Sequence, residues 1–176
     1  GLAPMGIQGM ELGRTHPQDR PVDEVAYHMY DGAYDVVSVF PEVTDRVPRP
    51  SGGWHQEALD AHGGWISSAT DLIRFVTASD GRPGRADFLS AQSTALMTQK
   101  PELPRWRNRA VYYAMGWSVR PVEGDATWWH NGALPGTSTL FLRSWHGYNW
   151  AVLTNSRPED GGGFCCTTPP GHAFSP

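Results

Sequence analysis

The stretch Thr127-Trp-Trp-His-Asn-Gly-Ala-Leu-Pro-Gly-Thr-Ser-Thr-Leu-Phe141 decides the fold of this chain. Two runs rich in β-branched and aromatic residues are separated by a short connector with proline and glycine, which is the pattern of two paired antiparallel strands. We predict that residues 127–130 pair with residues 137–143, and that His130 to Ala133 lie at the end of the first strand. Gly132 has no Cβ, so the backbone there would let a ligand approach closely.

The same strand pattern continues on both sides of this central pair. Residues 111–119 and 149–155 are short runs of aromatic, apolar or β-branched residues, and hairpin-sized connectors separate the strands from residue 111 onward. Three or four short strands with such connectors predict an antiparallel meander.

Two helices are expected before the meander. Ser68 is suited to the N-cap of the first helix, with Asp71 three residues later, and Gly81 is suited to its C-terminal cap. A buried stripe at helical spacing should consist of Ala69, Leu72, Ile73 and Val76, widened by Phe75. A second, shorter helix is predicted from about residue 90 to residue 98. The proline-rich first fifty residues predict loops, with strands expected only between residues 25 and 40.

Composition limits the function classes that need consideration. The 176 residues are enough for one domain with a core, and a net charge of −4 argues against nucleic-acid binding. No apolar run approaches the roughly 20 residues that cross a bilayer. No signal peptide is visible, so the compartment, cytoplasmic or exported, stays open. Neither the adjacent Cys165 and Cys166 nor the histidines form a metal-binding pattern, and we expect no metal and no cofactor.

Several motifs in a fixed order resemble the β-lactamase-related serine hydrolases, which include class C β-lactamases, D-alanyl-D-alanine carboxypeptidases and esterases. The matching segments are Gly6 to Thr15, Gly63 to Phe75, Tyr113 to Trp117, and His130-x-Gly132 with Pro135-Gly136, Ser138 and Val152 to Asn155. The resemblance implies an α/β fold of the α+β type, with an antiparallel sheet and flanking helices as in part of a β-lactamase/transpeptidase-like fold. Residues 1–160 would be the C-terminal part of that domain, followed by an irregular tail over residues 161–176.

The resemblance also implies roles for residues of the central stretch. The backbone N–H of Ala133 would form half of an oxyanion hole, and Gly132 would provide clearance. His130 would orient a substrate carboxylate or polarise the hydroxyl network. Asn131 would hydrogen-bond the substrate from the strand, and Trp65 could line the cleft. An alternative to these substrate-binding roles remains open: His130 and Asn131 could be solvated turn residues of a surface hairpin.

The nucleophile of that family is missing from this chain. Its Ser-x-x-Lys motif cannot occur, because Lys100 is the only lysine and Met97 stands three residues before it. No tyrosine has asparagine two residues later, and Ser138 lacks the closing glycine of a nucleophile elbow. We therefore expect a fragment that is inactive alone and needs an N-terminal half to act through an acyl-enzyme on ester, amide or β-lactam carbonyls of a small molecule or peptide. We also expect self-association through an exposed sheet edge.

A non-enzymatic alternative remains open at this point. Eight tryptophans, acidic charge and short antiparallel strands would suit a carbohydrate- or protein-binding module. The helix predicted after Gly63 separates the two interpretations, because a lectin-like sandwich has little use for it, whereas the hydrolase sheet needs helices packed on it.

Overall fold

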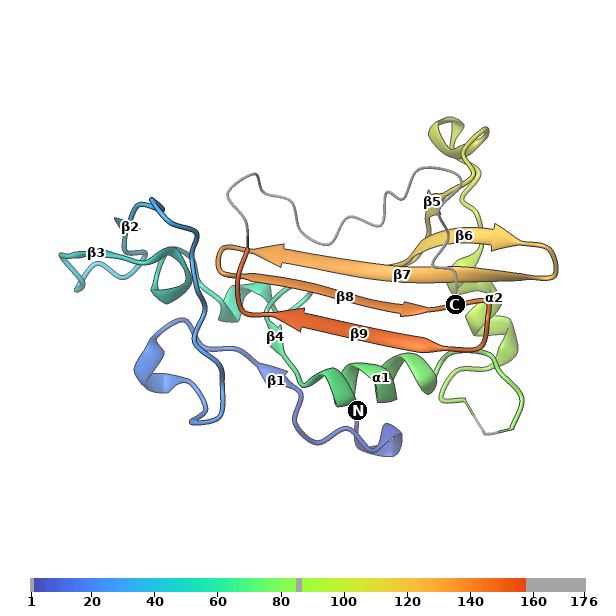
Figure 1. Ribbon diagram of the computed structural model, residues 1–176, viewed down its shortest axis with the longest axis horizontal. Coiled ribbons are helices and arrows are strands. Elements are labelled where there is room, and N and C mark those ends of the chain that lie inside the picture. Colours follow the sequence, from blue (N-terminus) through green and yellow to red (C-terminus); the bar gives the residue numbers. More distant parts are fainter. Residues whose placement is uncertain (1, 85–86, 158–176) are drawn as a thin grey trace.

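The structure is a computed structural model that describes residues 2–84 and 87–157. In this described part, five strands form an antiparallel sheet in chain order, β5-β6-β7-β8-β9 (Figure 1). The strands are β5 (Tyr112–Tyr113), β6 (Ser118–Val122), β7 (Asp125–Leu134), β8 (Thr137–Arg143) and β9 (Asn149–Thr154). The expected meander and the expected α/β class with an antiparallel sheet are therefore confirmed.

The hairpin of β7 and β8 confirms the predicted antiparallel pair but corrects one detail. β7 continues to Leu134, so His130 to Ala133 lie inside the strand and not at its end. The connector needs only two residues, because Gly136 takes a φ of +81°, which a residue without a Cβ adopts without strain.

One half of β7 lies beside a strand on only one side. β6 pairs with β7 from Asp125 as far as Trp129, whereas β8 pairs with β7 along the whole length from Trp128 to Leu134. Residues 130–134 therefore have β8 on one side and none of the described strands on the other. Backbone N–H and C=O groups along such an edge can bind an extended ligand.

The segment 111–119, expected to be one strand, forms parts of two strands. Tyr112 and Tyr113 form β5, the chain then reverses, and β6 begins at Ser118. The turn is closed by a hydrogen bond from the Ala114 N–H to the Trp117 carbonyl of 2.7 Å, and Gly116 takes a φ of +77°. The glycine therefore permits a reversal between two segments that both contain residues favouring strand.

The first predicted helix is α1 (Ala69–Thr77), which packs against β8 and β9 (Figure 1). Ser68 is its N-cap, as expected, and its hydroxyl accepts a 3.1 Å hydrogen bond from the Asp71 N–H. The C-terminal end was predicted wrongly: the helix ends at Thr77 with Ala78 as its cap, and Gly81 takes its positive φ in the turn that follows. Ala69, expected in the buried stripe, is exposed.

The second helix, α2 (Ala91–Thr98), confirms the predicted range, with Ser90 as its N-cap. Together the helices and strands enclose an aromatic core. Its buried members are Val76, Tyr112, Trp117, Val119 and Trp128, with Phe75 and Phe141 among the partly buried residues packed against them. None of the described helices is long and apolar enough to cross a membrane.

A buried arginine fastens the turn after α1 to the sheet. The Arg143 guanidinium is 5% exposed and pairs with the Asp125 carboxylate at 2.5 Å. It also donates to the backbone carbonyls of Asp80 and Ala126 and lies 4.4 Å from the centroid of the Trp128 ring. These contacts satisfy the charge that burial would otherwise penalise.

The N-terminal sixty residues form loops that cover the end of the β7–β8 hairpin. A Cβ on Gly136 would lie 2.9 Å from side-chain atoms of both Tyr27 and Pro50, so these residues close over the turn. Of the strands expected between residues 25 and 40, the structure shows only β2 (Val36–Val37) and a single bridge between His28 and Ser156. The expected tail, residues 161–176, lies outside the described residues.

The short elements of this N-terminal part pair locally. The strands are β1 (Glu11–Leu12), β2 (Val36–Val37), β3 (Arg46–Val47) and β4 (Trp65–Ile66), with β1 paired to β4 and β2 to β3. The 3-10 helices are Ala3–Met5, Pro17–Asp19, Arg49–Ser51, Glu57–Leu59 and, before β5, Pro104–Trp106.

Candidate functional site

His130 is held by a hydrogen bond at the edge of β7 that lacks a β6 partner. Its Nε2 lies 3.0 Å from the Tyr113 hydroxyl, and the two rings meet edge to face with centroids 6.0 Å apart. Tyr113 is 41% exposed, and His130 is half-buried. The pair therefore combines a fixed geometry with access from solvent.

A chain of aromatic contacts connects the His130 imidazole to α1. The His130 ring stacks on Phe141 with centroids 6.3 Å apart and planes 25° apart. Phe141 in turn meets Trp117 and Phe75 edge to face, at 5.3 and 6.4 Å. Edge-to-face aromatic pairs at these distances are favourable, so the ring beneath His130 is fixed by the core.

At position 132 the paired strand β8 leaves no room for a side chain. The two residues Gly132 and Thr139 are opposite each other in the β7–β8 register, and a Cβ on the glycine would lie 2.6 Å from Thr139 Oγ1. Gly132 shares its face of the sheet with His130, because both positions are separated by two residues on one strand. The packing against Thr139 is thus a reason for glycine here in addition to the clearance that we expected for a ligand.

Asn131 and Ala133 point to the opposite face from His130, since side chains alternate along a strand. Both are exposed. Ala133 lies opposite Ser138, whose hydroxyl is buried and forms no hydrogen bond among the described residues. The backbone N–H groups, however, lie in the plane of the sheet, so the role expected for the Ala133 N–H does not depend on the face to which its methyl group points.

None of the interactions among the described residues links Trp65 to His130. Trp65 lies on β4, 45% exposed, and its indole N–H donates to the Asp60 carbonyl at 2.8 Å. Three further tryptophans, Trp117, Trp128 and Trp129, are buried. They belong to the packing of the sheet.

Tyr113 is the site residue that the sequence reasoning missed. It stands in the Tyr-x-x-Gly-Trp motif, but its relation to His130 depends on the turn at Gly116, which returns the chain along β5. Its neighbour Tyr112 differs in environment: the Tyr112 hydroxyl donates to the Thr98 carbonyl, and burial raises the pKa of this phenol. Of these two tyrosines, Tyr113 is the one whose hydroxyl contacts a residue of β7.

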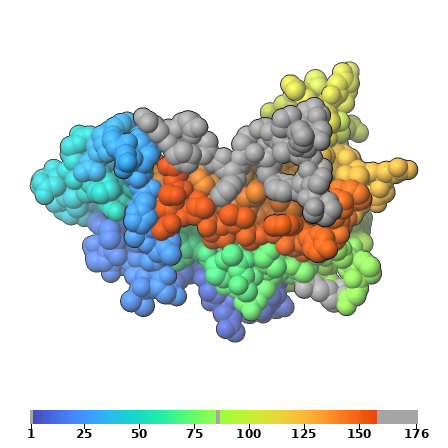
Figure 2. Space-filling view, viewed as in Figure 1, coloured from blue at the N-terminus to red at the C-terminus, as the bar shows by residue number. Residues whose placement is uncertain are grey.

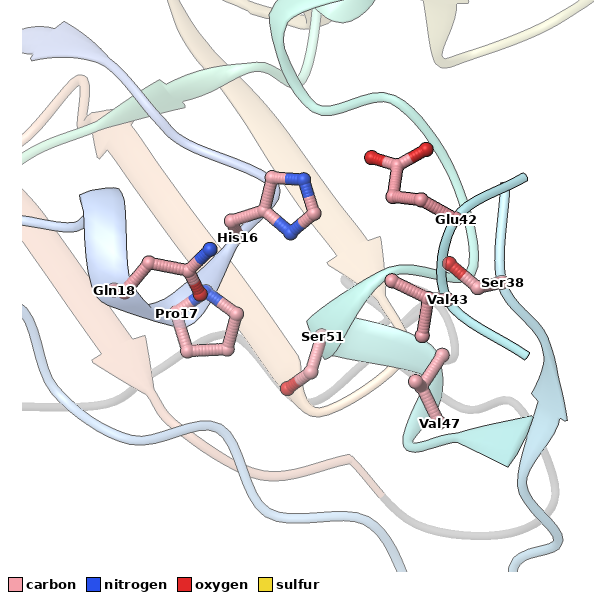
Figure 3. Close-up of a pocket in the computed structure, with 8 residues that line it drawn as sticks. All are labelled: His16, Pro17, Gln18, Ser38, Glu42, Val43, Val47 and Ser51. Atoms are coloured by element: carbon pink, nitrogen blue, oxygen red, sulfur yellow. The ribbon is translucent and has the colours of Figure 1, made fainter. Parts of the chain in front are cut away.

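A separate open pocket of about 430 Å³ lies in the N-terminal part (Figure 3). Its lining consists of His16, Pro17, Gln18, Ser38, Glu42, Val43, Val47 and Ser51. The His16 ring stacks on the Phe40 ring with centroids 3.8 Å apart, and the His55 ring meets the Phe40 ring edge to face. Within residues 2–84 and 87–157, no three His, Cys, Asp or Glu side chains gather as metal ligands would.

Comparison with known proteins places the chain in a family. The family model described as Beta-lactamase matches residues 2–164. A comparison with curated protein sequences finds no match. Solved structures with a similar fold include the D-amino acid amidase of Ochrobactrum anthropi SV3 complexed with L-phenylalanine amide, with 22% identity and a TM-score of 0.61 over 93% of this chain and 44% of the amidase.

Another similar structure is the D-stereospecific amidohydrolase of Streptomyces sp., with 18% identity, a TM-score of 0.53 and coverage of 88% of this chain and 41% of that protein. The chain thus spans less than half the length of these enzymes. At such identities the structures show a shared fold, and the family match extends over most of the sequence. The chain belongs to the β-lactamase family.

Proposed function

We propose that this chain supplies one wall of the active site of a serine hydrolase that acts through an acyl-enzyme on ester, amide or β-lactam carbonyls. The observation that carries the proposal is the His130 imidazole, held by Tyr113 beside residues 130–134 of β7, where none of the described strands pairs with the edge opposite β8. An acyl substrate could lie along that edge in extended form and meet the imidazole there.

Each residue of the stretch has a distinct part in this proposal. The Ala133 N–H would donate to the oxyanion of the tetrahedral intermediate, a contribution of about 10²–10³ in rate for each donor. Gly132 keeps the approach to this backbone free of a side chain. His130 and Asn131 would bind polar groups of the substrate, and Trp65 would line the cleft with its exposed indole.

The nucleophile would come from residues outside this chain. Lys100 is the only lysine, and the residue three positions before it is Met97, so the Ser-x-x-Lys element has to be supplied by another segment. A share of 44% of the amidase length agrees with such a division.

The packing of α1 favours the hydrolase over a carbohydrate- or protein-binding module. Phe75 of α1 contacts Phe141 of β8, and Val76 is 1% exposed within the core under the sheet. A helix integrated into the core in this way is expected of the layered hydrolase fold and not of a lectin-like sandwich.

The similar structures suggest the substrates to try first. Both are enzymes whose names specify D-stereospecific amide hydrolysis, and one was solved with a phenylalanine amide. Amides of D-amino acids are therefore the first class to test, followed by p-nitrophenyl esters and a chromogenic β-lactam.

The test is to express this chain together with the polypeptide encoded upstream of Gly1 and to measure hydrolysis of these substrates. We expect the upstream sequence to contain Ser-x-x-Lys, and His130→Ala to lower kcat/KM by about 10²-fold or more. His146→Ala, on the exposed turn before β9, is the matched control and should leave the rate unchanged. Equal rates for the two variants would refute the assignment of His130.

A further inference from the structure

We infer that Tyr113 is a positioning residue that fixes the tautomer of His130: its hydroxyl donates to Nε2, which leaves the proton of the neutral imidazole on Nδ1 as a donor toward a substrate oxygen. This inference deepens the proposed function and rests on it. It assigns the chemical group at which the strand would bind a carbonyl or carboxylate oxygen.

The direction of the hydrogen bond follows from the chemistry of the two groups. A neutral imidazole has one donor nitrogen and one acceptor nitrogen, whereas a phenol can donate or accept. The phenol oxygen delocalises a lone pair into its ring and is the weaker acceptor, and the unprotonated imidazole nitrogen is a strong one. At 3.0 Å the bond between Tyr113 Oη and His130 Nε2 therefore has its proton on the tyrosine.

The orientation of the imidazole makes this assignment stable. Phe141 stacks on the ring at 6.3 Å, and Trp117 and Phe75 pack against Phe141. Turning the ring by half a turn about the Cβ–Cγ bond would keep its plane against Phe141 but place Cε1 where Nε2 now lies, and the bond to Tyr113 would be lost. Which nitrogen carries the proton is thus set by the hydrogen bond that the other nitrogen makes.

The ring nitrogen available to a substrate is then Nδ1. None of the hydrogen bonds among the described residues engages this nitrogen, and the side chain is half-buried on the strand that has an open edge. With Nε2 occupied, Nδ1–H is the remaining polar group of the ring. It can donate to a substrate oxygen without the imidazole having to carry a positive charge, and partial burial strengthens such a bond.

The experiment is nuclear magnetic resonance of the chain with ¹⁵N-labelled histidine, recorded at a pH at which the His130 imidazole is neutral. Long-range ¹H–¹⁵N spectra distinguish the protonated ring nitrogen from the unprotonated one. In the wild type we expect the Nδ1–H pattern. Tyr113→Phe removes only the hydroxyl, and we expect the two ¹⁵N shifts to move toward the Nε2–H pattern that an unconstrained imidazole favours. Tyr148→Phe, on an exposed turn, is the control.

The wild-type spectrum is decisive even if a variant folds poorly. An Nε2–H pattern in the wild type, or a Tyr113→Phe spectrum identical to that of the Tyr148→Phe control, would overturn the inference. Neither result depends on hydrolysis. The failure of this inference and the failure of the proposed activity are therefore distinguishable, because the first is read in the tautomer and the second in substrate turnover.

Discussion

The hydroxyl oxygen of Thr139 lies 2.6 Å from the position that a Cβ would occupy on Gly132. The two residues are paired across β7 and β8, and Thr139 is a β-branched residue with little freedom to turn away. This contact couples the candidate site to the packing of the hairpin, so a change at Gly132 affects stability as well as ligand approach.

We predict that Gly132→Ala lowers the free energy of unfolding by about 1–3 kcal/mol, because the added methyl group forces a shift of the paired strand. Thr139→Ala should relieve most of that loss in the double variant. The measurement is urea denaturation of the two single variants and the double variant, read as a double-mutant cycle. Strictly additive losses would show that the two side chains do not interfere.

Arg143 supplies a second prediction, on stability alone. Arg143→Met keeps the apolar length but removes the pair with Asp125 and the donors to two backbone carbonyls. We expect the free energy of unfolding to fall by about 3 kcal/mol, near the lower end for a broken buried ion pair. The loss is limited because the Asp125 carboxylate is partly exposed and can be rehydrated. Arg107→Met, at an exposed position, is the control for removal of one positive charge. Equal denaturation midpoints for the two variants would contradict this account.

Glu57 provides a prediction on pH. Burial pushes the pKa of its carboxyl up, but the hydrogen bonds that it accepts from the hydroxyl and the N–H of Thr15 outweigh that effect, so the pKa lies below its usual value of 4.5. A carboxyl with a depressed pKa adds stability above its unfolded-state pKa, and this stability is lost as the pH falls through the lower folded-state pKa.

Wild type should therefore be more stable than Glu57→Gln at neutral pH, and the difference should shrink as the pH falls below about 4.5. Melting temperatures across that range measure it. Glu102→Gln, at an exposed position, should show no such convergence. A difference that grows on acidification would reverse the sign and exclude this explanation.

Self-association is expected at β9, the last strand of the described sheet. Among the described strands, β9 has only β8 as a neighbour, and the segment reaches the molecular surface (orange-red in Figure 2). Trp150 and Val152 of β9 and Tyr148 of the preceding turn expose apolar surface. A charge on a sheet edge opposes pairing with another chain, so Val152→Lys should shift the chain toward monomer in size-exclusion chromatography. Val22→Lys, a distant exposed position, should not. A wild-type chain that elutes as a monomer would contradict the expectation.

The local parts of the fold could be predicted, and the long-range relations could not. The N-cap at Ser68 and the hairpin around the Pro135-Gly136 connector follow from neighbouring residues alone, because caps and turns are determined locally. The C-terminal end of α1 was misjudged because a glycine three residues further on looked like the better cap. In the segment 111–119, residues that favour strand stand at both ends, and the reversal between them at Gly116 was not recognised as a turn.

That reversal explains why half of the candidate site was missed. His130 could be chosen from its own motif, but Tyr113 reaches it only because β5 folds back beside β6. In the same way, the sequence indicated glycine at position 132 without indicating that Thr139 fills the space above it. Both relations depend on strand register, which is set by the whole sheet.

The central claim is that this chain forms part of a serine hydrolase site without its nucleophile, and intact-mass spectrometry after exposure to a fluorophosphonate probe or a penicillin tests it most directly. The account predicts no adduct on the isolated chain. It predicts a stoichiometric adduct on the serine of a Ser-x-x-Lys motif when the chain is combined with the polypeptide encoded upstream of Gly1. A stoichiometric adduct on any serine of this chain, Ser138 included, would contradict it.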